Sequence, residues 1–278
     1  TLIPKKPKIG KAVTAVPECI GPEIEALAQK AQPGSILLLE NLRFHPEEEQ
    51  NDPQFAASLA RLGEFYINDA FGAAHRAHAS TEGIAKLLPS AAGLLLEKEL
   101  KSLSKILNNP ARPYWLILGG AKVSDKIQLI DNLIDQVDGI LIGGGMQYTF
   151  FQAQGIGIGN SPVEKTALET THALIAKAKA KNVQFHLPLD HRIAQSIEPD
   201  AKVEVTEKPG VKEDWEGVDI GPKTIIRYQQ LLQEAKTVLW NGPVGVFEVD
   251  RFSLGTRAIA ETLAELDAVT VVGGGDTS

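Results

Sequence analysis

Short apolar runs alternate along the chain with longer segments in which apolar residues recur every third or fourth position, as on one face of a helix. The apolar runs occupy residues 36–39, 65–67, 114–118, 139–142, 183–187, 237–240 and 268–272. Nearly continuous apolar runs of this kind are typical of strands that helices cover on both faces of a parallel sheet. The pattern therefore predicts a doubly wound α/β protein.

The segments with helical periodicity predict helices at residues 54–62, 94–107, 124–136 and 163–180, and a further helix that begins at Met146. The segment 94–107 is a long amphipathic one with charges between its apolar positions, and Pro110 and Pro113 follow it. Proline lacks an N–H and disfavours helix in the residue before it, so we expect the helix to end there. This layout predicts two α/β domains, at residues 1–93 and 110–278, joined by a helix at 94–109. An ordinary surface helix in a single domain is the alternative.

The overall charge restricts the classes of partner. The chain has 278 residues, and 28 Lys and Arg stand against 35 Asp and Glu, which gives a net charge of −7. An acidic balance argues against a nucleic-acid partner bound by general phosphate neutralisation. No apolar run is long enough to span a membrane, and the single Cys19 cannot form an intramolecular disulfide or a CxxC zinc site. We expect a cytoplasmic monomer with no nucleic-acid or membrane partner.

Glycine clusters follow four predicted strands in the second half of the chain. They lie at residues 119–120, 143–145, 242 with 245, and 273–275. In open α/β sheets, ligands bind outside the carboxyl ends of the strands. Glycine permits close backbone approach and positive φ, so we expect its N–H groups to face an anion. Four clusters at one edge predict a ligand that carries phosphate or a nucleotide.

The standard nucleotide and hydrolase fingerprints do not occur in this sequence. It contains no Gly-x4-Gly-Lys-Ser/Thr loop and no Gly-x-Ser-x-Gly elbow. The glycines at 155, 157 and 159 only imitate a dinucleotide fingerprint, because they follow a predicted helix and not a strand. An NAD-dependent dehydrogenase is therefore disfavoured.

Charged residues beside the glycines suggest how a phosphate could be handled. Lys122 and Lys126 flank Asp125, and a spacing of four would place both lysines on one helical face. Lysine is a mobile point charge suited to a transferring phosphoryl group, although a solvated helix face is the alternative. Asp125 and Asp276 are candidate ligands for Mg²⁺, which takes few carboxylates and completes its shell with phosphate and water.

The first half of the chain offers cations of a different type. Arg43 follows a predicted strand, and Arg76 lies in the sequence His75-Arg76-Ala77-His78. The planar guanidinium group matches carboxylate and phosphate, so two arginines in loops suit a small anionic substrate. His75 and His78 could serve as metal ligands, but no third ligand of matching spacing accompanies them.

Longer motifs occur in order along the chain. They are LENLRFH at 39–45, NDAFG at 68–72, HRAH at 75–78, LGGAKVSDK at 118–126, GGGM at 143–146, WNGPVGVFE at 240–248 and GGGDT at 273–277. With these motifs the chain resembles the phosphoglycerate kinase family. The resemblance implies two Rossmann-like parallel-sheet domains joined by a long hinge helix. It also implies reversible phosphoryl transfer between 1,3-bisphosphoglycerate and MgADP, giving 3-phosphoglycerate and MgATP, in glycolysis or carbon fixation.

The resemblance implies roles for individual residues. Arg43, His75 and Arg76 would bind the phosphate and carboxylate of the glycerate. Lys122 would stabilise the phosphoryl group during transfer, Lys126 would contact the nucleotide phosphates, and Asp276 would serve Mg²⁺, for which Asp125 is the second candidate ligand. The nucleotide site would comprise Gly120, Ala121, Lys126, Gly145, Gly217, Val218, Asn241, Gly242, Val244, Phe247, Glu248, Gly274, Gly275, Asp276 and Thr277. Within this set, Gly217 and Val218 would lie near the adenine and Glu248 at the ribose.

The sequence also departs from the family pattern. The family's opening strand with an Asp and an Asn, its catalytic arginine loop and its His-x-Gly-Arg-Pro loop do not occur, nor does a second glycine-rich loop for the transferred phosphate. Ala73 and Gln147 stand where other residues are expected. We therefore expect the chain to be the central portion of such a kinase, with nucleotide binding partly retained and turnover impaired. A non-catalytic nucleotide-binding or interaction module is the alternative.

Overall fold

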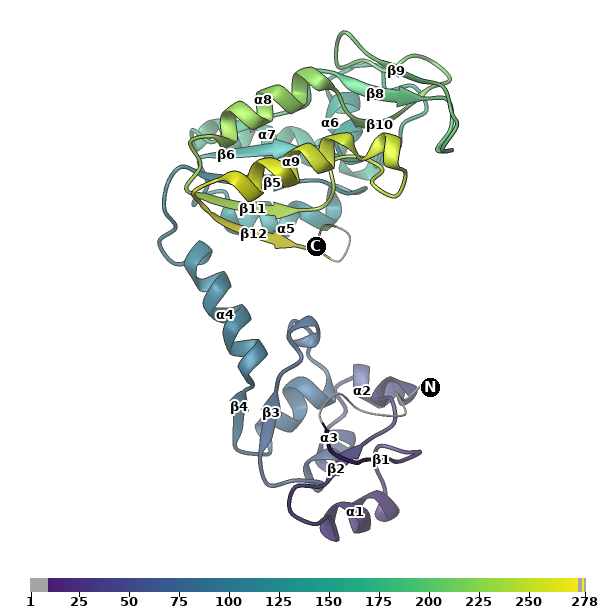
Figure 1. Cartoon of the computed structure of the whole chain (residues 1–278), viewed down its shortest axis with the longest axis vertical. Coiled ribbons are helices and arrows are strands. Elements are labelled where there is room, and N and C mark those ends of the chain that lie inside the picture. The colour runs from purple at the N-terminus through teal and green to yellow at the C-terminus, as the bar shows by residue number, and fades with distance from the viewer. Residues whose placement is uncertain (1–9, 275–276, 278) are drawn as a thin grey trace. The chain divides into compact units, whose positions relative to one another are not determined.

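The computed structural model describes residues 10–274 and 277 (Figure 1). The chain divides into two compact units, Thr1–Lys101 and Ser102–Ser278. The division falls within helix α4 (Leu94–Leu107), which covers the residues predicted for the amphipathic helix. None of the described helices is long and apolar enough to cross a bilayer.

The first unit contains two small parallel sheets, each of two strands. One pairs β1 (Val13–Ala15) with β2 (Ile36–Leu38), and the other pairs β3 (Tyr66–Asn68) with β4 (Ser90–Ala92). The helices of this unit before α4 are α1 (Pro22–Gln29), α2 (Pro46–Glu49) and α3 (Pro53–Ala60). Its core is formed by Cys19, Phe55, Ala56, Leu59, Ala79 and Ile84. The strands β1 and β4 were not predicted, because three residues with little apolar character give no run to detect.

Two aspartates fix where helices of the first unit begin. The carboxylate of Asp52 accepts the N–H groups of Gln54 and Phe55, with a proline at the first position of α3. Asp69, in the NDAFG motif, accepts the N–H groups of Leu95 and Leu96 at the start of α4. Such carboxylates satisfy N–H groups that the helix itself leaves without a partner. The aspartate of this motif therefore has a structural role.

A five-stranded parallel sheet forms the centre of the second unit (Figure 1). Its strand order is β12 (Val269–Gly273), β11 (Thr237–Asn241), β5 (Tyr114–Leu118), β6 (Gly139–Ile142) and β7 (Gln184–His186). The bounds of β5 and β6 agree with the predicted runs, and the other three strands lie within two residues of theirs. All neighbours in this sheet are parallel, as predicted.

Helices cover both faces of this sheet. Tyr114, Leu116 and Leu118 of β5 pack in one core with α5 (Ser124–Leu133), α6 (Gln147–Ala153) and α7 (Leu168–Ala180). Trp115 and Ile117 pack in a second core with α8 (Pro222–Leu232) and α9 (Leu254–Glu265). Because successive side chains of a strand point to opposite faces, the continuous apolar run of β5 contributes side chains to both cores. The prediction of a doubly wound α/β fold is confirmed.

A second sheet in this unit was not predicted. It is antiparallel, with the order β10 (Glu216–Ile220), β8 (His191–Ala194) and β9 (Val203–Val205). Charged residues interrupt each strand, so the sequence shows no apolar run there. The predicted helix 163–180 is also shorter than expected, because α7 begins only at Leu168. Shorter helical turns lie at Leu42–Phe44, Phe71–Ala73, Ala79–Gly83, Ile84–Lys86, Lys165–Ala167 and Asp250–Phe252.

Candidate functional site

The path of the chain through the large sheet identifies the expected ligand edge. From β5 the chain moves outward to β6 and β7, and it later returns to the other side of β5 with β11 and β12. The strand order therefore reverses between β5 and β11. Ligands of open α/β sheets bind outside the carboxyl ends of the strands at such a switch point.

The glycine loops at this edge are hydrogen-bonded to one another. The N–H of Gly119 donates to the Asn241 carbonyl at 3.0 Å, and the N–H of Gly120 donates to the Pro243 carbonyl at 3.0 Å. A Cβ at Gly119 would overlap the Pro243 carbonyl oxygen, and Gly120 has a φ of +94°. The expectation that these N–H groups face an anion is wrong, because neighbouring carbonyls already accept them. Glycine is needed here so that two loops can approach backbone to backbone.

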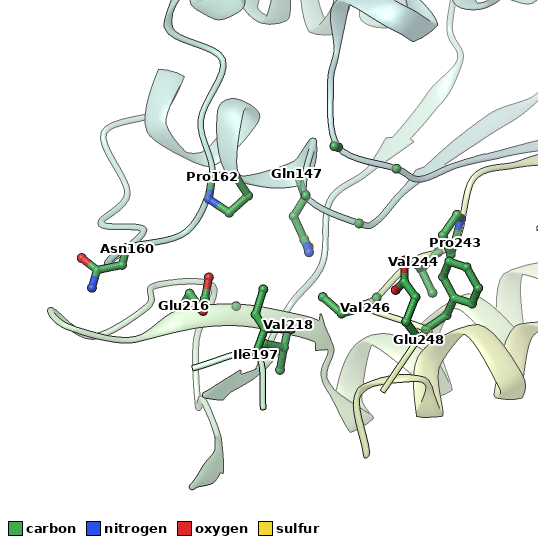
Figure 2. Close-up of a pocket in the computed structure, with 17 residues that line it drawn as sticks. Gln147, Asn160, Pro162, Ile197, Glu216, Val218, Pro243, Val244, Val246 and Glu248 are labelled. Atoms are coloured by element: carbon green, nitrogen blue, oxygen red, sulfur yellow. The ribbon is translucent and has the colours of Figure 1, made fainter. Parts of the chain in front are cut away.

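A pocket of about 460 Å³ lies at this switch point (Figure 2). It is lined by Gly120, Ala121, Gly144, Gly145, Gln147, Asn160, Pro162, Ile197, Glu216, Gly217, Val218, Pro243, Val244, Gly245, Val246, Phe247 and Glu248. Most of its lining side chains are apolar, and Figure 2 shows Pro162 on one side of the pocket and Val218 and Val246 on the other. Apolar walls with a few polar groups are the usual surroundings of a flat organic ring.

Many of the residues predicted for the nucleotide site line this pocket. They are Gly120, Ala121, Gly145, Gly217, Val218, Val244, Phe247 and Glu248. Gly217 is required by packing, because a Cβ there would overlap the Tyr148 hydroxyl. Its N–H donates to Ser161 Oγ at 2.9 Å, which fixes this edge of β10. The structure thus brings three loops and one strand, distant in sequence, to one cavity.

A second group of predicted residues gathers at the ends of β11 and β12. Lys126 Nζ donates to Asn241 Oδ1 at 2.5 Å, and the N–H of Gly242 donates to Thr277 Oγ1 at 3.0 Å. Gly274 lies beside them with a φ of +95°. This arrangement places one ammonium group, held by an amide, at the carboxyl ends of the central strands. Gly275 and Asp276 lie outside the described residues.

Lys122 is not on a helical face with Lys126. Helix α5 begins at Ser124, so Lys122 lies in the preceding loop and is exposed. The N–H of Ser124 donates to Glu164 Oε2 at 3.1 Å. Hydrogen bonding from Ser124, with a smaller contribution from the charge of Lys122, holds the pKa of Glu164 below its ordinary value. The anion at the start of α5 is therefore a carboxylate of this chain.

Asp125 offers an exposed carboxylate in the first turn of α5. Oxygen donors suit Mg²⁺, and one or two carboxylates are enough when phosphate oxygens and water complete the shell. The described residues hold one group of three side chains close enough to share a metal ion, which is Glu18, Cys19 and His45 in the first unit. There His45 Nε2 lies 2.7 Å from Glu18 Oε1. The Asp125 carboxylate has the chemistry that Mg²⁺ prefers, and an ion there would take its other ligands from phosphate and water.

The structure brings only some of the cationic residues predicted for the first unit into one pocket. His75 and Arg76 line one pocket of about 480 Å³, together with Asn68, Ala74, Ala77, Thr81, Glu82, Ala85 and Lys86. Arg43 is not among its lining residues, and its Nε lies 3.9 Å from Glu49 Oε1. The His78 side chain is buried, with its Nδ1 3.7 Å from Glu48 Oε1. A metal site shared by His75 and His78 gains no third ligand from the described residues.

Some lining residues were not predicted. Ile197, Glu216 and Asn160 come from segments without a recognisable motif, and only the fold brings them to the pocket. Gln147 could be noticed in the sequence, because another residue is expected directly after the GGGM motif. Burial raises the pKa of Glu216 above its ordinary value.

Comparison with known proteins places the chain in a family. The family model described as phosphoglycerate kinase matches residues 5–278. Phosphoglycerate kinase from Moorella thermoacetica is 52% identical over 269 residues, which cover 97% of this chain and 68% of that protein. The enzyme of that name from Synechococcus sp. (strain JA-3-3Ab) is 52% identical over 273 residues, covering 97% and 66%.

A solved structure is similar as well. The structure of phosphoglycerate kinase from Coxiella burnetii has a TM-score of 0.80 and 43% identity, and the match covers 87% of this chain and 62% of that one. The chain spans about two thirds of the length of the curated relatives quoted above. The similarity in sequence extends through both units, and the similarity in structure extends over most of the chain. The chain therefore belongs to the phosphoglycerate kinase family.

Proposed function

We propose that this chain binds MgADP or MgATP in its second unit and a phosphoglycerate in its first, for reversible phosphoryl transfer between 1,3-bisphosphoglycerate and MgADP. The observation that carries the proposal is the pocket at the β5–β11 switch point, next to the Lys126–Asn241 pair. The reaction gives 3-phosphoglycerate and MgATP. The charge balance, the short apolar runs and the single Cys19 support the further proposal of a cytoplasmic protein without nucleic-acid or membrane partners, and the monomeric state stays a prediction.

The chemistry of the site matches the three parts of a nucleotide. The apolar walls suit the base, which Gly217 and Val218 would contact. The exposed carboxylate of Glu248 can accept hydrogen bonds from ribose hydroxyls. The ammonium group of Lys126 and the hydroxyl of Thr277 suit phosphate oxygens, together with the backbone of Gly274 and Gly275.

The reaction needs positioning and charge neutralisation more than a nucleophile from the protein. An acyl phosphate is already activated, so the nucleotide oxygen can attack it directly. Lys122 lies in an exposed loop, and its flexible side chain can follow the charge that develops on the phosphoryl oxygens. Asp125 and Asp276 would hold Mg²⁺, which neutralises phosphate charge when bound.

The glycerate side would use the cations of the first unit. His75 and Arg76 already share a pocket, and Arg43 lies in the short helical turn Leu42–Phe44. Guanidinium groups bind phosphate and carboxylate in two parallel hydrogen bonds. We take the segment 94–109, most of which is α4, as the hinge about which the two domains, 1–93 and 110–278, would close to exclude water.

Replacing Lys126 with alanine is expected to weaken MgADP binding about tenfold, because one charge-assisted hydrogen bond to phosphate is lost. Isothermal titration calorimetry on the 278-residue chain measures this. Lys177→Ala is the matched control, since Lys177 pairs with Asp131 on the surface and does not line the pocket. The absence of any MgADP binding by the parent chain would contradict the proposal. A coupled assay of ATP-dependent 3-phosphoglycerate phosphorylation then tests turnover.

Replacing Arg43 with alanine is expected to weaken 3-phosphoglycerate binding about tenfold and to leave MgADP affinity unchanged. The guanidinium group would contact only the glycerate. Arg61→Ala is the control, because Arg61 pairs with Glu25 elsewhere in the same unit. Separate calorimetric titrations with 3-phosphoglycerate and with MgADP measure the two affinities. Equal losses for both ligands would show that the proposed division between the two units is wrong.

A further inference from the structure

The residues predicted to bind the glycerate lie on two separate segments of the first unit. Arg43 lies just before α2, whereas His75 and Arg76 lie in the loop that follows the NDAFG motif. The phosphate and the carboxylate of one small molecule are a fixed distance apart. The two segments must therefore be held at one spacing if their cationic side chains are to bind the same molecule.

One buried carboxylate connects these two segments. Glu48 belongs to α2, and the residue is only 3% exposed. Its Oε2 accepts the N–H of Ser80 at 2.9 Å, and its Oε1 accepts the hydroxyl of Ser80 at 2.5 Å. His78 Nδ1 lies 3.7 Å from the same Oε1. The helix that follows Arg43 is thus tied to the segment that follows the other two predicted residues.

The hydroxyl of Thr81 continues this connection as far as Arg76. Thr81 Oγ1 accepts the N–H of His78 at 2.9 Å and donates to the Arg76 carbonyl at 2.7 Å. Thr81 directly follows Ser80 in the same helical turn. A change in how Glu48 holds this turn would therefore move the backbone of Arg76.

The carboxylate of Glu48 is costly for the fold. An ionised group loses its hydration when it is buried, and the hydrogen bonds from Ser80 offset that loss. The neighbouring Glu47 and Glu49 are exposed, so α2 turns one of its three carboxylates inward. An apolar side chain would serve packing alone at least as well. The charge and the two acceptor atoms of Glu48 therefore call for a role beyond packing.

We infer that Glu48 is a positioning residue for the glycerate site, an inference that rests on the proposed function. Its hydrogen bonds fix the spacing between the turn of Arg43 and the loop of Arg76, and this spacing sets the affinity for phosphoglycerate. Guanidinium groups bind oxyanions in two parallel hydrogen bonds, a geometry that tolerates displacements of only about 0.5 Å. The Glu48 carboxylate itself makes no contact with the anionic ligand.

Glu48→Gln is expected to weaken 3-phosphoglycerate binding about tenfold and to leave MgADP affinity unchanged, because an amide has one acceptor atom where the carboxylate has two. Calorimetric titrations of the 278-residue chain with each ligand measure both affinities. Ser80→Ala removes one hydrogen bond and keeps the charge, so about threefold weaker 3-phosphoglycerate binding is expected. Glu47→Gln is the matched control, since Glu47 is the adjacent, exposed residue of α2.

Leu59→Ala separates positioning from stability. Leu59 is buried in the core of the first unit, and its side chain makes no hydrogen bonds. This variant is expected to lower the midpoint of thermal unfolding, yet to bind 3-phosphoglycerate like the parent chain below its unfolding transition. An equal loss of affinity in Leu59→Ala would overturn the inference, because lower stability alone would then explain the effect of Glu48→Gln.

Two further outcomes distinguish this inference from the proposed function. Parent-like 3-phosphoglycerate binding by folded Glu48→Gln would overturn the inference and leave the proposed function standing. If Glu48→Gln does not fold, parent-like binding by Ser80→Ala overturns it in the same way. Absence of 3-phosphoglycerate binding by the parent chain would overturn the proposed glycerate site, and this inference with it.

Discussion

Gly119→Ala is expected to lower the unfolding free energy of the second unit by about 3 kcal/mol and to abolish MgADP binding. Gly119 ends β5, and an added Cβ would overlap the Pro243 carbonyl oxygen and lie 2.6 Å from the Gly242 carbonyl oxygen. Both neighbours are backbone atoms, so no change of rotamer relieves the overlap. The loop after β11 must move, and it carries much of the pocket lining.

Thermal unfolding followed by circular dichroism checks this result, together with a titration of MgADP. For a unit of this size we expect the midpoint to fall by roughly 6–12 °C. Gly72→Ala and Gly155→Ala are the controls, because nothing lies within 4 Å of an added Cβ at either position. Gly155 has a φ of +73°, so it adds only the strain of a left-handed alanine, about 1 kcal/mol. Similar losses in all three variants would show that the loop contact is unimportant.

His191 is expected to make the chain less stable in acid by about 3 kcal/mol between pH 7.5 and pH 4. Its ring is fully buried on β8, with the rings of Tyr148 and Phe151 at 5.4 Å and 5.3 Å. Nε2 donates to the Pro209 carbonyl at 2.8 Å, whereas Nδ1 is buried with no partner. Burial lowers the pKa of His191 from 6.5 to about 4, although the hydrogen bond to Pro209 and the charge of Asp190 oppose the shift.

The direction of this change in stability follows from whether the folded or the unfolded chain binds the proton. Below pH 6.5 the unfolded chain protonates this histidine and the folded chain does not, so stability is complete above pH 6.5 and is lost as pH falls toward 4. The difference between a pKa of 6.5 and one of about 4 corresponds to about 3 kcal/mol. Urea unfolding at both pH values measures the difference. His191→Phe is expected to reduce it by that amount, and His172→Phe, at an exposed position on α7, is expected to leave it unchanged.

The structure confirms the parts of the fold that have a local cause. The runs that became β5 and β6 were predicted with their bounds because apolar side chains on both faces and a glycine at the end mark them. The start of α7 was placed too early: Glu164 lies outside the helix, where its carboxylate accepts the N–H of Ser124 and its own N–H donates to Thr149 Oγ1. Strand β10 was also missed, because Asp219 interrupts its apolar residues. That carboxyl is buried, its pKa is raised to about 7 by burial, and it accepts the N–H of Gly255.

For the candidate site, too, the features with a local cause were predicted and those that depend on distant residues were not. The motifs predicted which loops form it, and the roles of Lys122, Lys126 and Glu248 stay predictions from the family resemblance. The contacts could not be predicted. Lys126 meets Asn241, which lies 115 positions later, and no local pattern specifies that pairing. The N–H groups of Gly119 and Gly120 were assigned to an anion because the sequence does not show that the carbonyls of Asn241 and Pro243 already accept them.

By itself, the sequence determined the type of fold, the order of the sheet-forming runs and the family, because each depends on periodicity or on ordered motifs. Only the tertiary structure decided which residues share a cavity. Gly217 on an antiparallel strand, Gln147 behind a glycine turn and the loop after β11 meet there because the strand order reverses beside β5. The unpartnered oxygen of Gln147 is also a tertiary fact, since burial and missing partners depend on everything packed around a side chain.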